Sequence, residues 1–365
     1  MTGTEPDILF SVRGSLGLVT LNRPQALNAL TLEMFRTLDV TLAAWERDPA
    51  VRAVVVRGNG RAFCAGGDVV HVHESGLAAF NGIGDRGALA REVFAAEYRV
   101  DRRIARFPKP YIALLDGLVM GGGAGISLHG SHPLVTENTK FAMPECGIGL
   151  FPDIGASYFL PRCPGRTGLW LGLTGARIQA ADLLYLGLAR ALIPGSALDA
   201  LVDDLVTTAP NRLTREGIDS VIARYAVPAL PAPLAQNRDM IDRYYAFDQV
   251  EAIMAALEQD RGALATEQLA ALRRASPTAL KLTMSLFTLG AQLSLEDCLR
   301  QEYRLSQACL AGHDFYEGVR AMLIDKDKAP RWRPATPAEV DEALIERHFV
   351  FRPDIELSFP GEPSA

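Results

Sequence analysis

A run of three glycines followed by alanine, at residues 121–124, constrains the fold more than any other stretch of this chain. It follows an apolar, strand-like segment at residues 111–115 and opens a segment, 123–130, that is typical of a helix. The first N–H groups of a helix have no partner within the helix, and they carry a partial positive charge. Because glycine has no side chain, a ligand oxygen can approach these N–H groups closely. The run therefore predicts a strand–turn–helix unit whose turn can stabilise negative charge on a bound oxygen.

A second turn of the same design lies earlier in the chain. Residues 60–68 read Gly-Arg-Ala-Phe-Cys-Ala-Gly-Gly-Asp and follow the strand-like segment 53–57, and Asp68 is placed to cap or open the next helix. Two such turns can each direct one backbone N–H group at a single carbonyl oxygen. Together with the Met-Pro-Glu-Cys segment at residues 143–146, they point to an enzyme that acts on an acyl thioester.

Two other interpretations of the glycine run compete with this one. A dinucleotide-binding loop of the G-x-G-x-x-G type would need glycine three places after Gly123, where Ile126 stands, so we reject it. Alternatively, the glycines only permit tight turns. The occurrence of both turns in order favours the catalytic interpretation.

The composition excludes several classes of function. Hydrophobic residues make up 48% and charged residues 22%, as in soluble globular proteins, and the net charge of −6 argues against a nucleic-acid partner. The longest apolar runs are too short to cross a membrane, and residues 1–7 have no features of an export or import signal. Five cysteines without C-x-x-C spacing fit reduced, packed thiols, although Cys64 and Cys146 could also be nucleophiles. We therefore expect a cytoplasmic enzyme without membrane or nucleic-acid partners.

The pattern of apolar residues changes along the chain. Strand-like and helix-like segments alternate over the first 190 residues, which predicts an α/β layer arrangement, and the pattern after residue 194 is mostly helical. The predicted strands are 8–13, 18–21, 53–57, 111–115 and 133–136, and the first two are expected to form a hairpin. The main predicted helices are 30–47, 88–106, 123–130, 277–289 and 295–310. Thr31 is a plausible N-cap of the first helix, and Ser276 is the expected N-cap of the fourth, with proline at its first position.

Four segments in order resemble the enoyl-CoA hydratase/isomerase (crotonase) superfamily. They are residues 21–30, 62–68, 117–123 and 141–149. Residues 149–155, 157–162 and 302–327 are similar to its 3-hydroxyisobutyryl-CoA hydrolase branch. The resemblance implies a crotonase-like spiral of repeated β-β-α units over residues 8–195, a mostly helical region over 196–334 that packs on this core, and a tail over 335–365. It also leaves a homo-oligomer open, since crotonase relatives often form trimers or hexamers.

The resemblance further implies catalytic roles. Gly67 and Gly122 would supply the two oxyanion-hole N–H groups, and Glu145 matches the principal catalytic carboxylate of the superfamily. The second glutamate of a hydratase would fall at position 125, where this chain has glycine, and Asp153 supplies a different carboxylate. This combination is the pattern of the hydrolase branch. Alternatively, Asp153 only caps a helix that starts near residue 154.

Substrate-binding residues follow from the same resemblance. Glu97 matches a hydrolase residue near the hydroxyl end of the substrate, although a lone helix glutamate is usually a solvated surface charge. The resemblance places Ala26, Ala65, Gly66 and Asp68 along the CoA path. CoA would be part of the substrate, so we expect no separate cofactor.

A metal site is not expected. His71 and His73 would face different directions on a helix, and no carboxylate repeats their spacing.

The reaction implied by the resemblance is hydrolysis of a short branched 3-hydroxyacyl-CoA, as in valine catabolism. The alternatives are an isomerase or hydratase of the same superfamily and, in another class, a non-catalytic acyl-CoA-binding protein.

Overall fold

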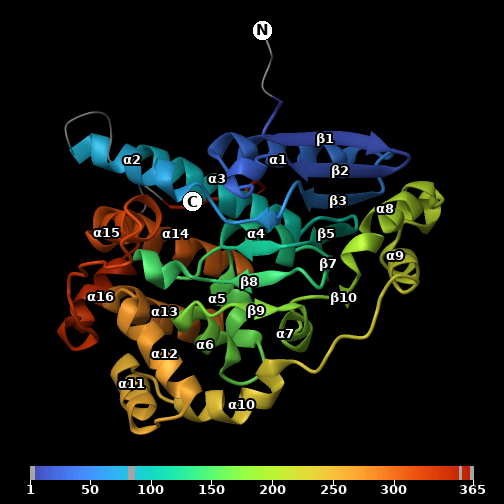
Figure 1. The fold of residues 1–365 in the computed structure, drawn as a ribbon. Coiled ribbons are helices and arrows are strands. Elements are labelled where there is room, and N and C mark those ends of the chain that lie inside the picture. The colour runs from blue at the N-terminus through green and yellow to red at the C-terminus, as the bar shows by residue number, and fades with distance from the viewer. Residues whose placement is uncertain (1–4, 81–86, 353–355, 362–365) are drawn as a thin grey trace. The chain divides into compact units, whose positions relative to one another are not determined.

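The computed structural model describes residues 5–80, 87–352 and 356–361 (Figure 1). The chain divides into two compact units, each assembled from three separate stretches. The first unit consists of Met1–Gly67, Arg99–Ala142 and Arg177–Gln236, and the second consists of Asp68–Tyr98, Met143–Ala176 and Asn237–Ala365. The domain limits predicted from the sequence stay a prediction.

The first unit is built around a sheet whose strand order is β1-β2-β3-β5-β7-β10 in the described part of the chain. These strands are β1 (Ile8–Arg13), β2 (Leu16–Leu21), β3 (Ala53–Gly58), β5 (Tyr111–Leu115), β7 (His132–Val135) and β10 (Ala191–Leu192). The first two form the predicted antiparallel hairpin, and every later pair is parallel. Strands β3, β5 and β7 are almost entirely buried, which agrees with their unbroken apolar sequences.

One face of this sheet is covered by two helices of the same unit, α8 (Leu198–Thr207) and α9 (Arg215–Ile222). Buried residues such as Leu16, Ile112 and Leu201 form a common apolar core between them. The predicted N-cap of helix α1 (Leu32–Arg47) is also confirmed, because the Thr31 hydroxyl accepts a hydrogen bond from the Met34 N–H group.

A second, smaller sheet in the first unit was not predicted. Its order is β4-β6-β8-β9, formed by β4 (Ala62–Cys64), β6 (Leu118–Met120), β8 (Lys140–Ala142) and β9 (Ile178–Gln179). Strands β4, β6 and β8 are parallel, and β9 is antiparallel to β8. Because parallel strands end at the same edge, this sheet brings together the turns that follow β4 and β6.

The remaining helical elements of this unit are the 3-10 turn η1 (Pro24–Ala26), α4 (Gly122–Leu128) and α7 (Ala180–Tyr185), with short turns at Gly195–Ala197 and Pro210–Arg212.

The second unit is mainly helical in its described residues. It holds α2 (Val69–Phe80), η2 (Glu145–Ile148), α5 (Ala156–Phe159), η3 (Leu160–Arg162), α6 (Thr167–Thr174), α11 (Val250–Gln259), α12 (Ala263–Arg274), α13 (Pro277–Gly290), α14 (Leu295–Ala311), α15 (Asp314–Val319), a π-helical turn at Arg320–Ile324, η7 (Pro337–Glu339) and α16 (Glu342–His348). Helices α3 (Ala88–Ala105) and α10 (Pro233–Tyr244) contribute to both units. Ser276 caps α13 as predicted, with Pro277 at the first helical position. None of the described helices combines the length and the apolar character needed to cross a membrane.

Candidate active site

The two glycine turns predicted from the sequence lie side by side in the first unit. Strand β4 leads into residues 65–67, and β6 leads into Gly121, after which α4 begins at Gly122. A Cβ atom at position 66 would lie 3.3 Å from the Met120 carbonyl oxygen and 3.7 Å from the Gly122 nitrogen. Gly66 has a φ of 110°, a conformation that favours glycine. As the first helical residue, Gly122 has an N–H group with no acceptor within α4, as an oxyanion donor requires.

The residues assigned to the CoA path fall into two groups. Ala26 ends η1, next to Leu27, whose carbonyl accepts the Ala65 N–H at 3.0 Å, and the Gly66 carbonyl accepts the Leu30 N–H at 2.9 Å. These hydrogen bonds hold the early turn against the 65–67 turn. Asp68 belongs to the second unit and lies at the start of α2, where its carboxylate accepts the His71 N–H at 3.4 Å. Asp68 thus opens a helix as predicted, and its contact with CoA stays a prediction.

Position 125 has a neighbour that the sequence did not reveal. A Cβ atom on Gly125 in α4 would lie 2.6 Å from Oδ1 of Asp101 and 2.9 Å from its Oδ2 and Cγ. Asp101 has no exposed surface, so it is not simply displaced into solvent. The space where a glutamate at position 125 would begin is therefore occupied by another carboxylate. Nothing in the sequence distinguishes Asp101 from an ordinary charged residue on a helix surface.

Four of the buried carboxyl groups described in the second unit form an interacting cluster. They are Glu97 of α3, Glu145 of η2, Asp153 before α5, and Glu302 of α14, with exposed fractions of 4%, 6%, 7% and 0%. Burial raises the pKa of Glu97 well above its ordinary value, and the charges of Asp153, Glu145 and Glu302 raise it further. The interpretation of Glu97 as a solvated surface charge is therefore wrong. Mutual repulsion also means that the four groups cannot all ionise easily.

One carboxylate oxygen of Glu145 makes no hydrogen bond to the described residues. Burial raises its pKa well above the ordinary value, and the charge of Asp153 adds to this effect. Its Oε2 atom is buried and has no hydrogen-bond partner among the residues that the structure describes. Buried polar atoms normally have a partner, so this oxygen is suited to meet water or a substrate group. A base of raised pKa that can face water or an acyl carbon fits general-base or nucleophilic chemistry.

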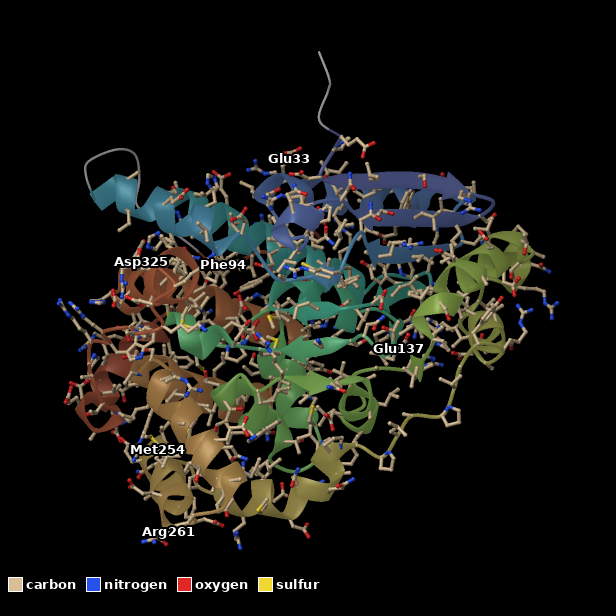
Figure 2. All side chains as sticks on the ribbon, viewed as in Figure 1. Glu33, Phe94, Glu137, Met254, Arg261 and Asp325 are labelled. Carbon is tan, nitrogen blue, oxygen red and sulfur yellow. The ribbon has the colours of Figure 1, made fainter. Side chains whose placement is uncertain are left out.

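Asp153 accepts a hydrogen bond from a tyrosine that the sequence did not single out. The Tyr98 hydroxyl donates to Asp153 Oδ2 at 2.6 Å, and the Tyr98 ring contacts Phe94 edge-on, with centroids 5.9 Å apart. Phe94 of helix α3 is labelled in Figure 2. Burial raises the pKa of Asp153 to about 6, while the Tyr98 hydrogen bond acts in the opposite direction. Helix α5 begins at Ala156, with Gly155 at the N-cap position and no side-chain cap hydrogen bond. The side chain of Asp153 is therefore not the cap of this helix.

The cysteines are packed inside the protein. All five are buried and outside disulfides. Burial raises the pKa of the Cys146 thiol to about 12, and its Sγ lies 3.4 Å from the Gly172 carbonyl oxygen. A neutral, hydrogen-bonded thiol is a poor nucleophile, so the packing interpretation is favoured for Cys146. Within the described ranges, no group of three or more His, Cys, Asp and Glu side chains is arranged to hold a metal ion.

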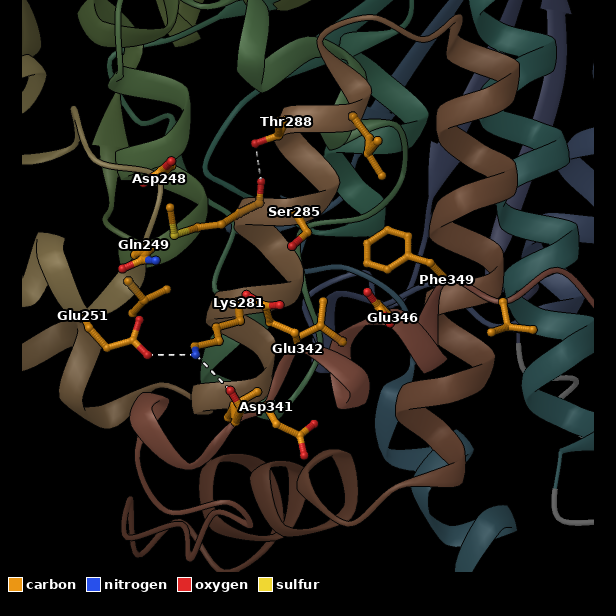
Figure 3. Close-up of a pocket in the computed structure, with 16 residues that line it drawn as sticks. Asp248, Gln249, Glu251, Lys281, Ser285, Thr288, Asp341, Glu342, Glu346 and Phe349 are labelled. Atoms are coloured by element: carbon orange, nitrogen blue, oxygen red, sulfur yellow. Dashed lines mark hydrogen bonds and ion pairs between the residues drawn. The ribbon is translucent and has the colours of Figure 1, made fainter.

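The second unit also has a cavity of about 790 Å³, lined by residues from α11, α13 and the segment 340–350 (Figure 3). Across it, Lys281 pairs with Glu251 at 2.8 Å and donates to the Val340 carbonyl at 2.9 Å. None of the residues assigned to the site from the sequence lines this cavity, so it is separate from the carboxyl cluster.

Comparison with known proteins agrees with this geometry. The sequence model of the enoyl-CoA hydratase/isomerase family matches residues 16–349. A Gallus gallus protein named 3-hydroxyisobutyryl-CoA hydrolase, mitochondrial, is 42% identical and aligns over 95% of this chain and 90% of its own length. Its Xenopus laevis counterpart, of the same name, is 44% identical over 93% of this chain and 88% of its own length. A crystal structure of a carnitinyl-CoA dehydratase from Mycobacterium thermoresistibile superimposes with a TM-score of 0.90, at 44% identity, over 98% of this chain and 99% of that one.

The comparisons correct one expectation and confirm another. The expected cytoplasmic location is wrong, because both animal relatives are named as mitochondrial enzymes. Buried free thiols indicate a reducing compartment but do not tell which one, and residues 1–4 lie outside the described residues. The expected crotonase-like α/β fold is confirmed by the structural match. This chain belongs to the enoyl-CoA hydratase/isomerase family.

Proposed function

We propose that this chain hydrolyses 3-hydroxyisobutyryl-CoA, or a closely similar short 3-hydroxyacyl-CoA, to the free acid and CoA. Relatives of that name align over nearly the whole chain at 42% and 44% identity. The observation that favours hydrolysis over hydration is the pair formed by Gly125 and Asp101. Position 125 lacks the second glutamate of a hydratase, and Asp101 fills the space that this glutamate would need.

The proposed reaction uses backbone donors for the carbonyl oxygen and carboxylates for the water. The N–H groups of Gly67 and Gly122 hold the thioester oxygen as it becomes negative, and one such donor is typically worth about 3 kcal/mol of transition-state stabilisation. Glu145 either takes a proton from the attacking water or attacks the acyl carbon to form a mixed anhydride that water then cleaves. In both routes water supplies the new acyl oxygen, the C–S bond breaks, and the sulfur leaves as the thiol. Asp153 orients the water or Glu145.

Substrate recognition completes the proposal. Glu97 would face the 3-hydroxyl group, and Ala26, Ala65, Gly66 and Asp68 would line the CoA path through backbone contacts. CoA enters as part of the substrate, and no separate cofactor is needed. We place the step in valine catabolism. The oligomeric state stays a prediction.

Dehydration or hydration is the second candidate, because the structure that superimposes at a TM-score of 0.90 is named a dehydratase. A panel of CoA esters separates the candidates. We expect 3-hydroxyisobutyryl-CoA to give steady release of free thiol, with no absorbance change from an enoyl double bond. Hydration of crotonyl-CoA without thiol release would contradict the hydrolase proposal, and saturable CoA-ester binding without turnover would indicate a binding protein.

A further inference from the structure

The backbone directly after Asp153 has an unusual conformation. Ile154 has a φ of 56° and Gly155 a φ of 81°, so two successive residues are left-handed. Glycine adopts this conformation readily, whereas a β-branched residue does so rarely and at an energetic cost. Such strain persists only where the surroundings hold the chain in place, and it is concentrated at functional sites. Something must therefore hold the loop that carries Asp153.

Glu302 is the group that holds it. From helix α14, its Oε2 accepts the Gly155 N–H at 2.7 Å, and its Oε1 accepts the Ser157 N–H at 3.0 Å and the Ser157 hydroxyl at 2.5 Å. Successive N–H groups in a turn of this kind converge on an anion. Both oxygens of a fully buried carboxyl are thus used on the loop that follows Asp153. Local sequence patterns do not reveal this contact, because Glu302 lies 147 positions from Gly155 and 145 positions from Ser157.

We propose that Glu302 is a positioning residue. It fixes loop 153–157 so that the Asp153 carboxylate keeps its hydrogen bond from the Tyr98 hydroxyl and remains near Glu145. This inference rests on the proposed hydrolase function. Glu302 itself touches no reacting atom; it acts through the backbone of the loop.

The energetics support a dedicated role. A buried carboxyl close to other carboxyls is costly, and a neutral side chain would anchor a loop at a lower cost if stability alone were needed. Burial raises the pKa of Glu302 to about 8, although the hydrogen bonds to Ser157 and Gly155 lower it and the charge of Asp153 raises it. The other titratable groups that interact with Glu302 are Glu97, Tyr98 and the Cys298 thiol.

Glu302→Gln tests the proposal, because it keeps the volume but turns its amide N–H₂ group toward a backbone N–H donor, that of Gly155 or that of Ser157. We expect kcat for thiol release to fall about 10- to 100-fold, with little change in KM, because a displaced catalytic group loses alignment with the substrate. Ser306→Ala is the matched control. Ser306 is buried on the same helix, and its hydroxyl donates to the Tyr303 carbonyl, so kcat should not change.

A titration of Asp153 tests the same proposal without turnover. Carbon-13 NMR of labelled aspartate carboxyls, assigned with Asp153→Asn, gives its midpoint in each variant. Removing the Glu302 carboxyl would lower this midpoint or leave it unchanged, because a group with a pKa of about 8 is mostly neutral near pH 6. Losing the Tyr98 hydrogen bond would raise the midpoint, since that bond lowers the pKa of Asp153. We expect the midpoint to rise in Glu302→Gln.

A folded Glu302→Gln enzyme with a normal kcat, or with an unchanged or lowered Asp153 midpoint, would overturn the proposal. If this variant does not fold, Ser157→Ala decides, because it removes one hydrogen bond and no charge. A raised Asp153 midpoint in Ser157→Ala supports the positioning role of Glu302, and an unchanged midpoint overturns it. Absence of thiol release from the wild-type protein would instead refute the hydrolase function. The NMR titration of Asp153 would still test the positioning role of Glu302.

Discussion

Glu145 and Asp153 carry the same functional group but have different surroundings. Asp153 has a tyrosine donor and a pKa of about 6, whereas Glu145 has an oxygen without a partner in the described structure and a pKa well above its ordinary value. Asp153 therefore ionises first as pH rises, and its charge holds the proton on Glu145 to a higher pH. Pairs of carboxyls with separated pKa values commonly divide the acid and base roles of a reaction.

Glu145→Gln should lower thiol release by at least about 100-fold, because the amide can neither accept a proton nor attack the acyl carbon. The volume is nearly the same, so the thermal melting temperature and the binding of CoA should be retained. Thiol-release kinetics and a melting curve check both points. A variant with most of its activity would remove Glu145 from the mechanism.

Asp153→Asn should lower kcat and remove the limb of the pH profile near pH 6, where burial places the ionisation of this carboxyl. Tyr98→Phe should move that limb to higher pH, because the Tyr98 hydrogen bond lowers the pKa of Asp153. The pH dependence of kcat for thiol release measures both shifts. An unchanged profile in Asp153→Asn would exclude a mechanism that needs both carboxyls.

The sequence predicts catalytic roles for Glu145 and Asp153, which stay predictions, but it does not reveal the residues that surround them. Tyr98 and Asp101 lie in no recognised motif, and Glu302 begins the similar segment 302–327 without an assigned role. Their importance comes from burial and from contacts made only in the fold. Glu97 shows the same limit, since an isolated glutamate on a helix is most often exposed. A charged residue that tertiary packing buries cannot be distinguished locally from one in solvent.

At the level of elements, long and periodic segments could be predicted, and short ones could not. The β1–β2 hairpin, the buried strands β3 and β5, and the capped helices α1 and α13 follow from local patterns and caps. The sheet β4-β6-β8-β9 was missed because its strands have only two or three residues, too few for any period. Yet this sheet brings the two glycine turns together.

Gly125→Ala should lower the free energy of unfolding by about 1–3 kcal/mol, because the new Cβ overlaps the Asp101 carboxylate in a packed region. Gly147→Ala is the control, since nothing lies within 4 Å of a Cβ atom there. Urea denaturation of both variants measures the difference. Equal stability would mean that Asp101 moves aside readily, and a glutamate at position 125 would then be compatible with the fold.

For the whole molecule, the buried carboxyls predict how stability depends on pH. Glu97, Glu145 and Glu302 all have raised pKa values in the folded state, so these groups bind more protons in the folded protein than in the unfolded chain at neutral pH. The free energy of unfolding should therefore fall as pH rises from about 7.5 through the pKa of Glu302, about 8, by about 1.4 kcal/mol per pH unit for each excess proton.

This pH window lies above the range in which histidines have the opposite effect. Burial lowers the pKa of His73, His132 and His348 below 6.5, and such histidines make stability rise with pH until the unfolded imidazoles have lost their protons, about one pH unit above 6.5. Denaturant unfolding across the window gives the slope, and Glu302→Gln should make it shallower. A slope of zero in the wild-type protein would show that Glu97, Glu145 and Glu302 have similar pKa values in the folded and unfolded states.

Neither unit is synthesised as one continuous stretch of the chain. The chain passes from one unit to the other five times, and the first unit lacks its last stretch until residue 236 has been synthesised. The second unit begins at residue 68 but receives Glu302 and the rest of α14 only in its final stretch. On the ribosome, Asp153 therefore emerges long before the side chain that holds its loop. The loop around Asp153 therefore lacks its hydrogen bonds to Glu302 until residues 295–311 have emerged.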